Sequence, residues 1–297
     1  MSDFTTRLIP GILYALLILG CLIFNSFSFL ILMLVFCIII IFEYGKVIRK
    51  DHQHLQFISG STKKNKKVKY GTVFFGTEFP ILTCFFILFS FGIHSILNNY
   101  ESSIWYELII LLFCLINSSI LIYLVLNNKS LFNSIKTKTW PLLGVIFSFL
   151  LIIYASLLYD YSNFKFFFLF YLLLIWGVDT FGYIVGVKFG KNKLFESLSP
   201  KKSIEGAVGA LIFSITYSIL ISFYLDISII FCTATCLLMC VLAIIGDLVQ
   251  SKIKRELKVK DFGKWLPGHG GLYDRMDSLI FTFPFLYLIV KILLYVS

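Results

Sequence analysis

The sequence predicts an all-α integral membrane protein of about nine transmembrane helices, with a cytoplasmic N-terminus and a polar site at the cytoplasmic interface. Hydrophobic residues make up 59% of the 297 residues and charged residues only 14%, whereas a soluble domain carries about a quarter charged residues. Long apolar runs alternate with short polar loops, which is typical of multispanning helical proteins. One integrated membrane domain therefore fits this chain better than two soluble domains.

Nine apolar runs approach or reach the roughly 17 to 25 residues that a helix needs to cross a bilayer. The first two are short and lie only a few residues apart around Asn25, so we expect a tight helical hairpin, with one long tilted helix as the alternative. Arg7 and the first run resemble a signal peptide, but no A-x-A-like cleavage site follows, which favours a retained span. The predicted spans are Ile9–Phe24, Phe27–Tyr44, Val73–Leu97, Ile104–Leu126, Trp140–Tyr159, Phe164–Val187, Ile204–Tyr224, Ile227–Val249 and Leu279–Val296.

The positions of lysine and arginine support this count and the orientation. With the N-terminus inside, the N-terminal segment and four inward loops hold 24 of the 26 Lys and Arg residues, as the positive-inside rule requires. The net charge of +10 is then concentrated on the cytoplasmic face, where the lipid bilayer's anionic headgroups or a polyphosphate substrate are suitable partners. No segment resembles a soluble nucleic-acid-binding module, so we expect no nucleic acid partner. The inward loops are Gly45–Thr72, Asn127–Thr139, Lys188–Ser203 and Gln250–Ser278.

Polar motifs crowd into the second half of the chain. We therefore distinguish an N-terminal membrane region with basic cytoplasmic loops, residues 1–139, from a C-terminal catalytic membrane region, residues 140–297, within one membrane domain. The most basic loop, Gly45–Thr72, is interpreted as a topogenic loop that contacts lipid. Cys232, Cys236 and Cys240 recur every four residues, and we interpret them as small buried side chains because no His or carboxylate flanks them.

Asp179 marks the first of three polar blocks. It lies inside the sixth predicted span, where a carboxylate is costly and is a functional candidate by default. Gly182, Gly186 and Gly190 follow at intervals of four and form a smooth helix face that allows close packing. On this segment alone, a functional role for Asp179 and a packing seam with one hydrogen-bonded Asp are equally supported.

The second block begins a predicted helix after a loop that ends at Ser199 and Pro200. Lys201 and Lys202 supply two positive charges, Ser203 is a candidate N-cap, and Glu205 falls in the first helical turn. A helix N-terminus flanked by lysines suits phosphate oxygens. Taken alone, an ordinary cytoplasmic loop that enters a span explains the same residues.

The third block connects the last two spans. Asp247, Ser251, Lys254 and Arg255 follow an i, i+4, i+7, i+8 spacing, so a helix places them on one face that runs from the bilayer into the cytoplasm. The segment "KDFGKWLPGHGGLYDRMDS" follows, in which Pro and Gly break the helix and two further glycines allow a close approach of the backbone to a ligand. Its candidate residues are Lys260, Asp261, His269, Gly270, Gly271, Asp274, Arg275 and Asp277.

This inventory predicts polyphosphate chemistry. The carboxylates of Asp247 and Asp274 are oxygen ligands of the kind that Mg²⁺ prefers. Lysines and arginines neutralise phosphate oxygens, and a glycine-rich turn admits them. No GxxxxGK[ST] or GxSxG motif is present, so neither a P-loop nor a hydrolase triad has support. An ordinary solvated loop is the alternative, but it would not need an Asp inside the membrane in helical register with Ser and Lys.

At these residues the chain resembles the phosphatidate cytidylyltransferases, also called CDP-diacylglycerol synthases. "SPKKSIEG" is similar to the family's SPKKTxEG, with Ser203 in place of Thr and Ile204 where Trp is common, and "DTFGYIVGVKFG" is similar to a second family segment. Motif resemblance extends from Trp176 to Ser278. The family's C-terminal signature is filled without a gap by Ser251, Lys254, Arg255, Lys260, Asp261, Gly263, Pro267, His269, Gly270, Gly271, Asp274, Arg275 and Asp277.

The resemblance implies that CTP and phosphatidate react to give CDP-diacylglycerol and pyrophosphate, at the cytoplasmic face of a bacterial inner membrane. It also implies a requirement for Mg²⁺ in a paired-cation centre at the positions of Asp247 and Asp274, with the second cation unidentified. A homodimer is suggested by the family and by the glycine seam.

The resemblance gives the remaining candidates their expected roles. Ser251, Lys254, Arg255 and Arg275 would act on the reacting phosphates, and His269 with Gly270 and Gly271 would orient phosphate oxygens. Either the lipid phosphate or the triphosphate would be held by Ser199, Lys201, Lys202, Ser203, Lys260 and Asp261. The supporting residues would be Asp179, Glu205 and Asp277.

Other functions remain as alternatives. A CDP-archaeol synthase would prefer ether-linked lipids, and a CTP-dependent lipid kinase would release a different nucleotide. The "DGxxAR" run of CDP-alcohol phosphotransferases is absent. A transporter is disfavoured because inverted repeats would place polar motifs in both halves.

Overall fold

The computed structural model describes residues 3–58, 89, 100–132, 138–158, 160–263 and 270–296. Contacts within the chain divide it into two compact units. Unit 1 comprises residues 1–159 and 253–276, and unit 2 comprises residues 160–252 and 277–297. The predicted functional division at residues 139 and 140 remains a prediction.

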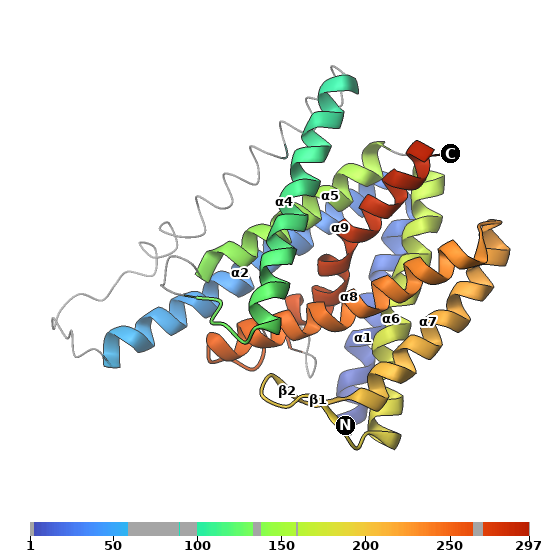
Figure 1. The fold of residues 1–297 in the computed structure, drawn as a ribbon. Helices are drawn as coiled ribbons and strands as arrows, with labels where there is room; N and C mark the ends of the chain where they lie inside the picture. The colour runs from blue at the N-terminus through green and yellow to red at the C-terminus, as the bar shows by residue number, and fades with distance from the viewer. Residues whose placement is uncertain are drawn as a thin grey trace. The chain divides into compact units, whose positions relative to one another are not determined.

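Seven helices in the described part of the chain are long and apolar enough to cross a membrane (Figure 1). This confirms the prediction of a multi-pass, mainly helical membrane protein. The total of nine spans and the cytoplasmic N-terminus remain predictions, and the predicted span Val73–Leu97 lies outside the described residues. The seven helices are α2 (Ser26–Ile58), α4 (Tyr100–Leu126), α5 (Trp140–Leu158), α6 (Tyr161–Phe189), α7 (Ile204–Leu225), α8 (Ile229–Glu256) and α9 (Tyr273–Val296).

Helix α1 (Asp3–Phe24) packs against α2 as the predicted hairpin. Asn25 interrupts the helix, and its side-chain oxygen accepts a hydrogen bond from the backbone N–H of Ser28 at 2.7 Å. The rings of Tyr14 and Phe36 stack with centroids 6.0 Å apart, which one long straight helix would not permit. The apolar part of α1, Pro10–Phe24, is shorter than the other spans.

Helix α5 packs against both α2 and α4 in unit 1. Most of its residues between Pro141 and Ser156 are buried. The ring of Phe147 lies 4.1 Å from that of Phe113 on α4, and the side-chain amide of Asn117 donates to the carbonyl of Trp140 at 3.4 Å. Because lipid tails are as apolar as the helices, such packing and interhelical hydrogen bonds hold these helices together.

A buried ion pair joins the start of α5 to α2. Lys138, immediately before α5, pairs with Asp51 on α2, and both side chains are almost fully enclosed. The hydroxyl of Tyr44 donates to the backbone carbonyl of Lys138 at 2.9 Å. A buried charge needs such a partner, so these contacts fix α2 in unit 1.

Helices α6 and α7 form the main contact of unit 2 along the predicted glycine seam. A Cβ atom built on Gly206 would lie 2.6 Å from the carbonyl oxygen of Gly182, so the two backbones meet closely. Gly186 and Gly190 pack against Ser203, because a Cβ atom built at either position would lie near the Ser203 side chain. The seam is therefore filled by the same chain, and the expected homodimer rests on the family resemblance alone.

A short hairpin lies where the sequence predicted an irregular loop between α6 and α7. Strand β1 (Lys193–Phe195) pairs antiparallel with β2 (Ser199–Ser203), with Lys193 opposite Ser203. The backbone N–H of Ile204 donates to the carbonyl of Asn192 at 2.9 Å and continues this connection into α7. The lysines of the second polar block therefore stand on a strand that leads directly into a helix.

Candidate functional site

The hairpin is fastened to the first turn of α7 by two side chains. Ser203 is the N-cap, and its hydroxyl oxygen accepts from the backbone N–H of Gly206 at 3.1 Å, which confirms the predicted cap. The carboxylate of Glu205 accepts from the backbone N–H groups of Lys191 and Asn192, each at 3.1 Å. These bonds hold the strand that carries Lys201 and Lys202. A supporting role for Glu205 in a metal shell remains a prediction.

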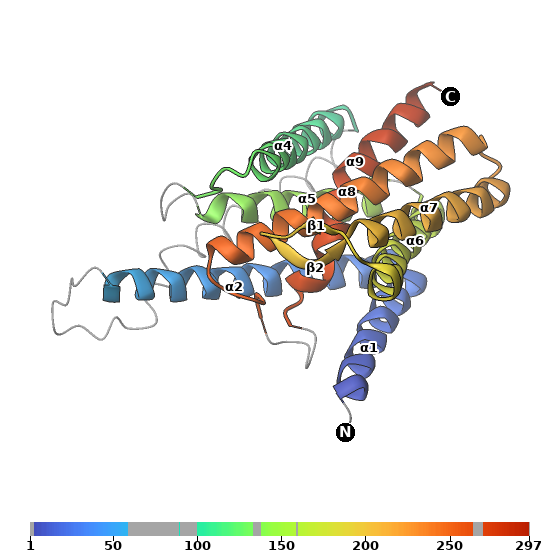
Figure 2. The same cartoon turned by 60° about the horizontal axis from the view of Figure 1, so that its bottom comes forward.

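Lys202 and Asp247 form an ion pair in unit 2. The pair joins β2 to α8, beside which the hairpin lies (Figure 2). Neighbouring residues of a strand point to opposite sides, and Lys201 is correspondingly exposed while Lys202 is half-buried. The side chain of Asp247 keeps 29% of its surface exposed, so the carboxylate is still open to a ligand.

Asp274 is the centre of the second cluster, in unit 1. One carboxylate oxygen, Oδ2, accepts from the backbone N–H of Phe262 at 2.9 Å and from that of Gly271 at 3.0 Å. The other, Oδ1, accepts from Nζ of Lys254 at 3.1 Å. The side chain is only 4% exposed. Asp274 therefore binds both ends of the glycine-rich segment and one motif lysine at once.

Glu43 of α2 contacts this cluster, and sequence analysis did not select it. Its Oε1 accepts from the backbone N–H of Leu272, and its Oε2 accepts from that of Tyr273, both at 3.1 Å. Glu43 is buried, with 3% of its surface exposed. The signal was present in the sequence, because a carboxylate lies one residue from the end of the apolar run Phe27–Tyr44.

The other predicted site residues differ in exposure and in their contacts. Asp179 on α6 is exposed, and the neighbouring Thr180 hydroxyl donates to the carbonyl of Trp176 at 2.7 Å. Asp277 accepts from the backbone N–H of Ser278 at 2.9 Å. Ser199 and Ser251 are half-buried, whereas Arg255, Lys260, Asp261 and Arg275 are exposed. His269 lies outside the described residues.

Gly270 and Gly271 are glycines for different structural reasons. Gly270 has a φ of +90°, a conformation that favours glycine. A Cβ atom on Gly271 would lie 2.6 Å from Oε2 of Glu43. The close approach that the sequence predicts at Gly271 is thus made to a protein carboxylate, and an approach of this segment to a substrate remains a prediction.

Two carboxylates have the donor chemistry that a magnesium ion needs. Among the described residues, no group of three or more His, Cys, Asp and Glu side chains could hold a metal. Mg²⁺ is usually bound by one or two carboxylates together with water and substrate phosphates. An ionised carboxylate has about four acceptor positions, and three of those of Asp274 are used. Asp274 therefore retains one acceptor position for such a cation, and the carboxylate of Asp247 is partly exposed.

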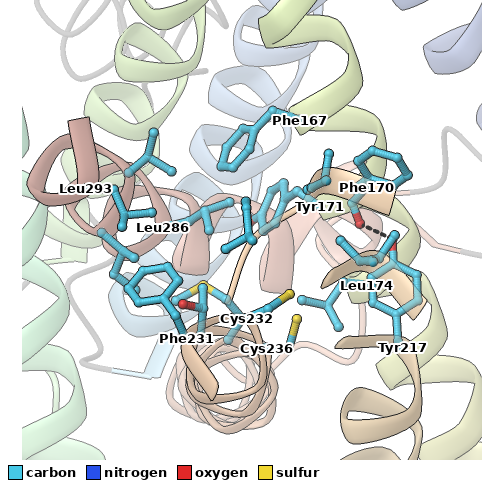
Figure 3. Close-up of a pocket in the computed structure, with 17 residues that line it drawn as sticks. Phe167, Phe170, Tyr171, Leu174, Tyr217, Phe231, Cys232, Cys236, Leu286 and Leu293 are labelled. Atoms are coloured by element: carbon cyan, nitrogen blue, oxygen red, sulfur yellow. Dashed lines mark hydrogen bonds between the residues drawn. The ribbon is translucent and has the colours of Figure 1, made fainter. Parts of the chain in front are cut away.

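An apolar pocket lies between α6, α7, α8 and α9 of unit 2, with a cavity volume of about 100 Å³. Figure 3 shows Phe167, Tyr171, Cys236 and Leu286 around it, and no described lining residue is charged. The hydroxyl of Tyr217 donates to the carbonyl of Phe170 at 2.8 Å, so it is already satisfied. The pocket is suited to hydrocarbon and unsuited to a nucleotide.

The chain is similar to known proteins. A family model described as the cytidylyltransferase family matches residues 5–293. Three bacterial proteins named phosphatidate cytidylyltransferase are similar to part of the chain. The protein from Bacillus subtilis is 38% identical over 122 residues, covering 40% of this chain and 45% of the relative. The protein from Staphylococcus haemolyticus is 42% identical over 116 residues, 38% of this chain and 45% of the relative. That from Thermotoga maritima is 38% identical over 125 residues, 40% of this chain and 46% of the relative. Each match spans less than half of the relative, and the matches confirm the resemblance found in the motifs.

Proposed function

Because this chain belongs to the cytidylyltransferase family, we propose that it transfers the cytidylyl group of CTP to phosphatidate, giving CDP-diacylglycerol and pyrophosphate. The observation that carries this proposal is the pairing of two motif aspartates with two motif lysines, Asp247 with Lys202 and Asp274 with Lys254. Lysines neutralise phosphate oxygens and carboxylates hold a hard cation. The names of the bacterial relatives support phosphatidate as the acceptor.

The reaction joins a lipid phosphate oxygen to the α-phosphorus of CTP. The bond between that phosphorus and the oxygen leading to the β-phosphate breaks, and pyrophosphate leaves with the electron pair. The lipid phosphate is a phosphomonoester whose second pKa is about 6, so its attacking oxygen is ionised near neutral pH. The chain needs no general base, and its task is to bring two anions together and to stabilise the leaving charge.

The basic residues would perform that task by changing partners. Lys202 and Lys254 neutralise carboxylates in this structure. We expect their ammonium groups to contact phosphate oxygens when substrates bind. A phosphate near each lysine would carry a larger negative charge than the carboxylate with which that lysine now pairs. Arg255 and Arg275 are exposed and would stabilise the leaving pyrophosphate, and His269 with the adjacent glycines would orient phosphate oxygens.

Asp247 and Asp274 would each bind a cation. Magnesium bound there would neutralise phosphate charge and polarise the phosphorus–oxygen bonds. The fit rests on oxygen donors, on the exposure of Asp247 and on the acceptor position that Asp274 retains. A second cation site is part of the proposal, and its identity is left open.

The apolar pocket would receive an acyl chain of the lipid. Along α8, Asp247 lies eight residues from Met239 and sixteen from Phe231, both of which line the pocket. At about 1.5 Å per residue these separations are about 12 and 24 Å. An acyl chain covers one leaflet, about 15 Å of hydrocarbon. A lipid whose phosphate lies near Lys202 and Asp247 would therefore extend its chain into this pocket.

We place the reaction at the cytoplasmic face of a bacterial inner membrane, since CTP is a cytoplasmic nucleotide and the positive charges of the sequence gather in the loops predicted to face inward. The lipid would enter sideways from the bilayer. Dimerisation is proposed on the family resemblance alone.

Incorporation of radiolabelled CTP into lipid by the purified protein tests the proposal. With phosphatidate and Mg²⁺, we expect label in a chloroform-soluble product and release of pyrophosphate, both lost with a chelator. Label only with ether-linked lipid would indicate a CDP-archaeol synthase. Transfer of the γ-phosphate of CTP would indicate a lipid kinase. Absence of any lipid product from folded protein would refute the proposed function.

A further inference from the structure

We propose that Glu43 is a positioning residue for this reaction, which holds the first turn of α9 so that Asp274 and Lys254 keep their orientation. This inference rests on the proposed function for its catalytic consequence, although the contact itself does not. Glu43 belongs to α2, in the half of the chain in which the motif analysis found no site residue.

The contact occupies the N-terminus of α9. The first N–H groups of a helix have no partner within it, and two of them, those of Leu272 and Tyr273, donate to Glu43. Helix N-termini attract anions because their N–H groups and the helix dipole are positive there. Here the protein supplies the anion, so a substrate phosphate is not expected at these two donors.

Two glycines make room for this carboxylate. A Cβ atom on Gly263 would overlap the carboxylate of Glu43, and one on Gly271 would lie 2.6 Å from its Oε2. Both positions belong to the motif that carries the family resemblance, and they flank residues 264–270 in the sequence. A residue more than 200 positions away in the sequence therefore explains why these two motif positions are glycine.

The same short segment is held by two carboxylates. Glu43 binds Leu272 and Tyr273, whereas Asp274 binds Phe262 and Gly271 through Oδ2. Without the Glu43 carboxylate, two buried N–H groups would lose their acceptor, and a buried donor without a partner is destabilising. A shift of this turn would move Asp274 directly, because Asp274 is the second residue of α9.

Aromatic packing supports the segment independently of Glu43. The ring of Tyr44 stacks on that of Phe262 with centroids 5.3 Å apart, and Phe262 lies 4.7 Å from the ring of Tyr273. A substitution at Glu43 that preserves volume should therefore leave the fold intact while it alters the orientation of the turn. Asp51, a buried carboxylate of α2 that pairs with Lys138, is a matched control.

The test compares Glu43→Gln with Asp51→Asn in the full-length protein. The introduced side-chain amide keeps one acceptor oxygen and turns an NH₂ group toward the other N–H donor. We expect kcat to fall about 100-fold, with the KM for CTP within about threefold and a melting temperature no lower than that of Asp51→Asn. Hydrogen exchange of the amides of Leu272 and Tyr273 should accelerate in Glu43→Gln and not in Asp51→Asn.

Unchanged kcat together with unchanged exchange at these amides would overturn the inference. A fall in kcat without faster exchange would also overturn it, because Glu43 would then act by another route. If wild-type protein makes no CDP-diacylglycerol, the proposed function fails, and the exchange measurement still decides whether Glu43 holds the turn.

A second pair of variants covers the case in which Glu43→Gln does not fold. Gly263→Ala should lose activity because its methyl group would overlap the Glu43 carboxylate. Adding Glu43→Asp, which shortens the Glu43 side chain, should raise the activity of the glycine variant at least tenfold, because contacting residues are energetically coupled. Simple multiplication of the two single defects would contradict the contact.

Discussion

Lys254 and Asp274 form an ion pair in which Nζ lies 3.1 Å from Oδ1 of an almost fully enclosed carboxylate. The lysine therefore occupies one of the positions at which a cation would bind Asp274. The pair neutralises the carboxylate, and it would make the lysine a competitor of the proposed cation.

Replacing Lys254 with Gln should slow turnover and tighten metal binding at the same time. We expect kcat to fall about 100-fold, since a cation near the transferring phosphate is lost. The Mg²⁺ concentration for half-maximal activity should decrease, because Asp274 loses its competing partner. A magnesium titration of cytidylyl transfer measures both effects, with Lys258→Asn as the exposed control. A higher magnesium requirement in Lys254→Gln would contradict competition at Asp274.

Replacing Asp247 with Asn should abolish most activity without unfolding the protein. A neutral amide is a poor magnesium ligand and no longer pairs with Lys202, so we expect a loss of about 1000-fold in kcat. Radiolabelled CTP incorporation measures the loss, and gel filtration in detergent checks the fold. Asp226→Asn is the matched control, because Asp226 ends α7 in a left-handed conformation that Asn also tolerates. Normal turnover by Asp247→Asn would remove this residue from the proposed metal site.

Replacing Ser203 with Ala should destabilise the protein modestly. The hydroxyl caps α7 through Gly206, and loss of such a cap costs about 1 kcal/mol. Thermal unfolding in detergent should show a lower midpoint for Ser203→Ala than for Thr216→Ala. Thr216 is exposed on the same helix, where its hydroxyl donates to the carbonyl of Ile212 at 3.1 Å. Equal midpoints for the two variants would argue against the cap.

Replacing Cys236 with Trp should change which lipids are used. The indole would fill part of the apolar pocket, so kcat/KM for phosphatidate with long acyl chains should fall at least tenfold relative to that with short chains. Val241→Trp is the control, because Val241 is exposed on α8 and does not line the pocket. The same change in chain preference in both variants would show that the pocket does not receive the lipid.

Local features were predictable from the sequence because they depend on neighbours along the chain. The helices follow from long apolar runs, the cap at Ser203 from a hydroxyl before a helix, and the glycine seam from its interval of four. The seam's partner was not predictable, since the sequence does not say that Gly206 of the next helix fills it. The hairpin was missed because its second strand, Ser199–Ser203, has neither alternation nor β-branched residues.

The role of Glu43 could not be predicted from sequence motifs. Its partners Leu272 and Tyr273 are 229 and 230 positions away, and no spacing rule connects such distant residues. A carboxylate near the end of the apolar run Phe27–Tyr44 is a functional signal by itself, but it belongs to no motif of the sequence. Attention to every acidic residue inside an apolar run would have selected it.

The contact between α2 and the first turn of α9 also predicts how the two parts of the protein would behave if they were expressed separately. Residues 140–297 contain every motif that resembles the family, yet a polypeptide made from them alone would lack the acceptor for two backbone donors and the aromatic ring that stacks on Phe262. Such a half should be inactive by itself and should regain function when residues 1–139 are expressed beside it as a separate chain. The two halves are thus expected to behave as complementing fragments of one enzyme, with the N-terminal fragment supplying more than membrane anchorage.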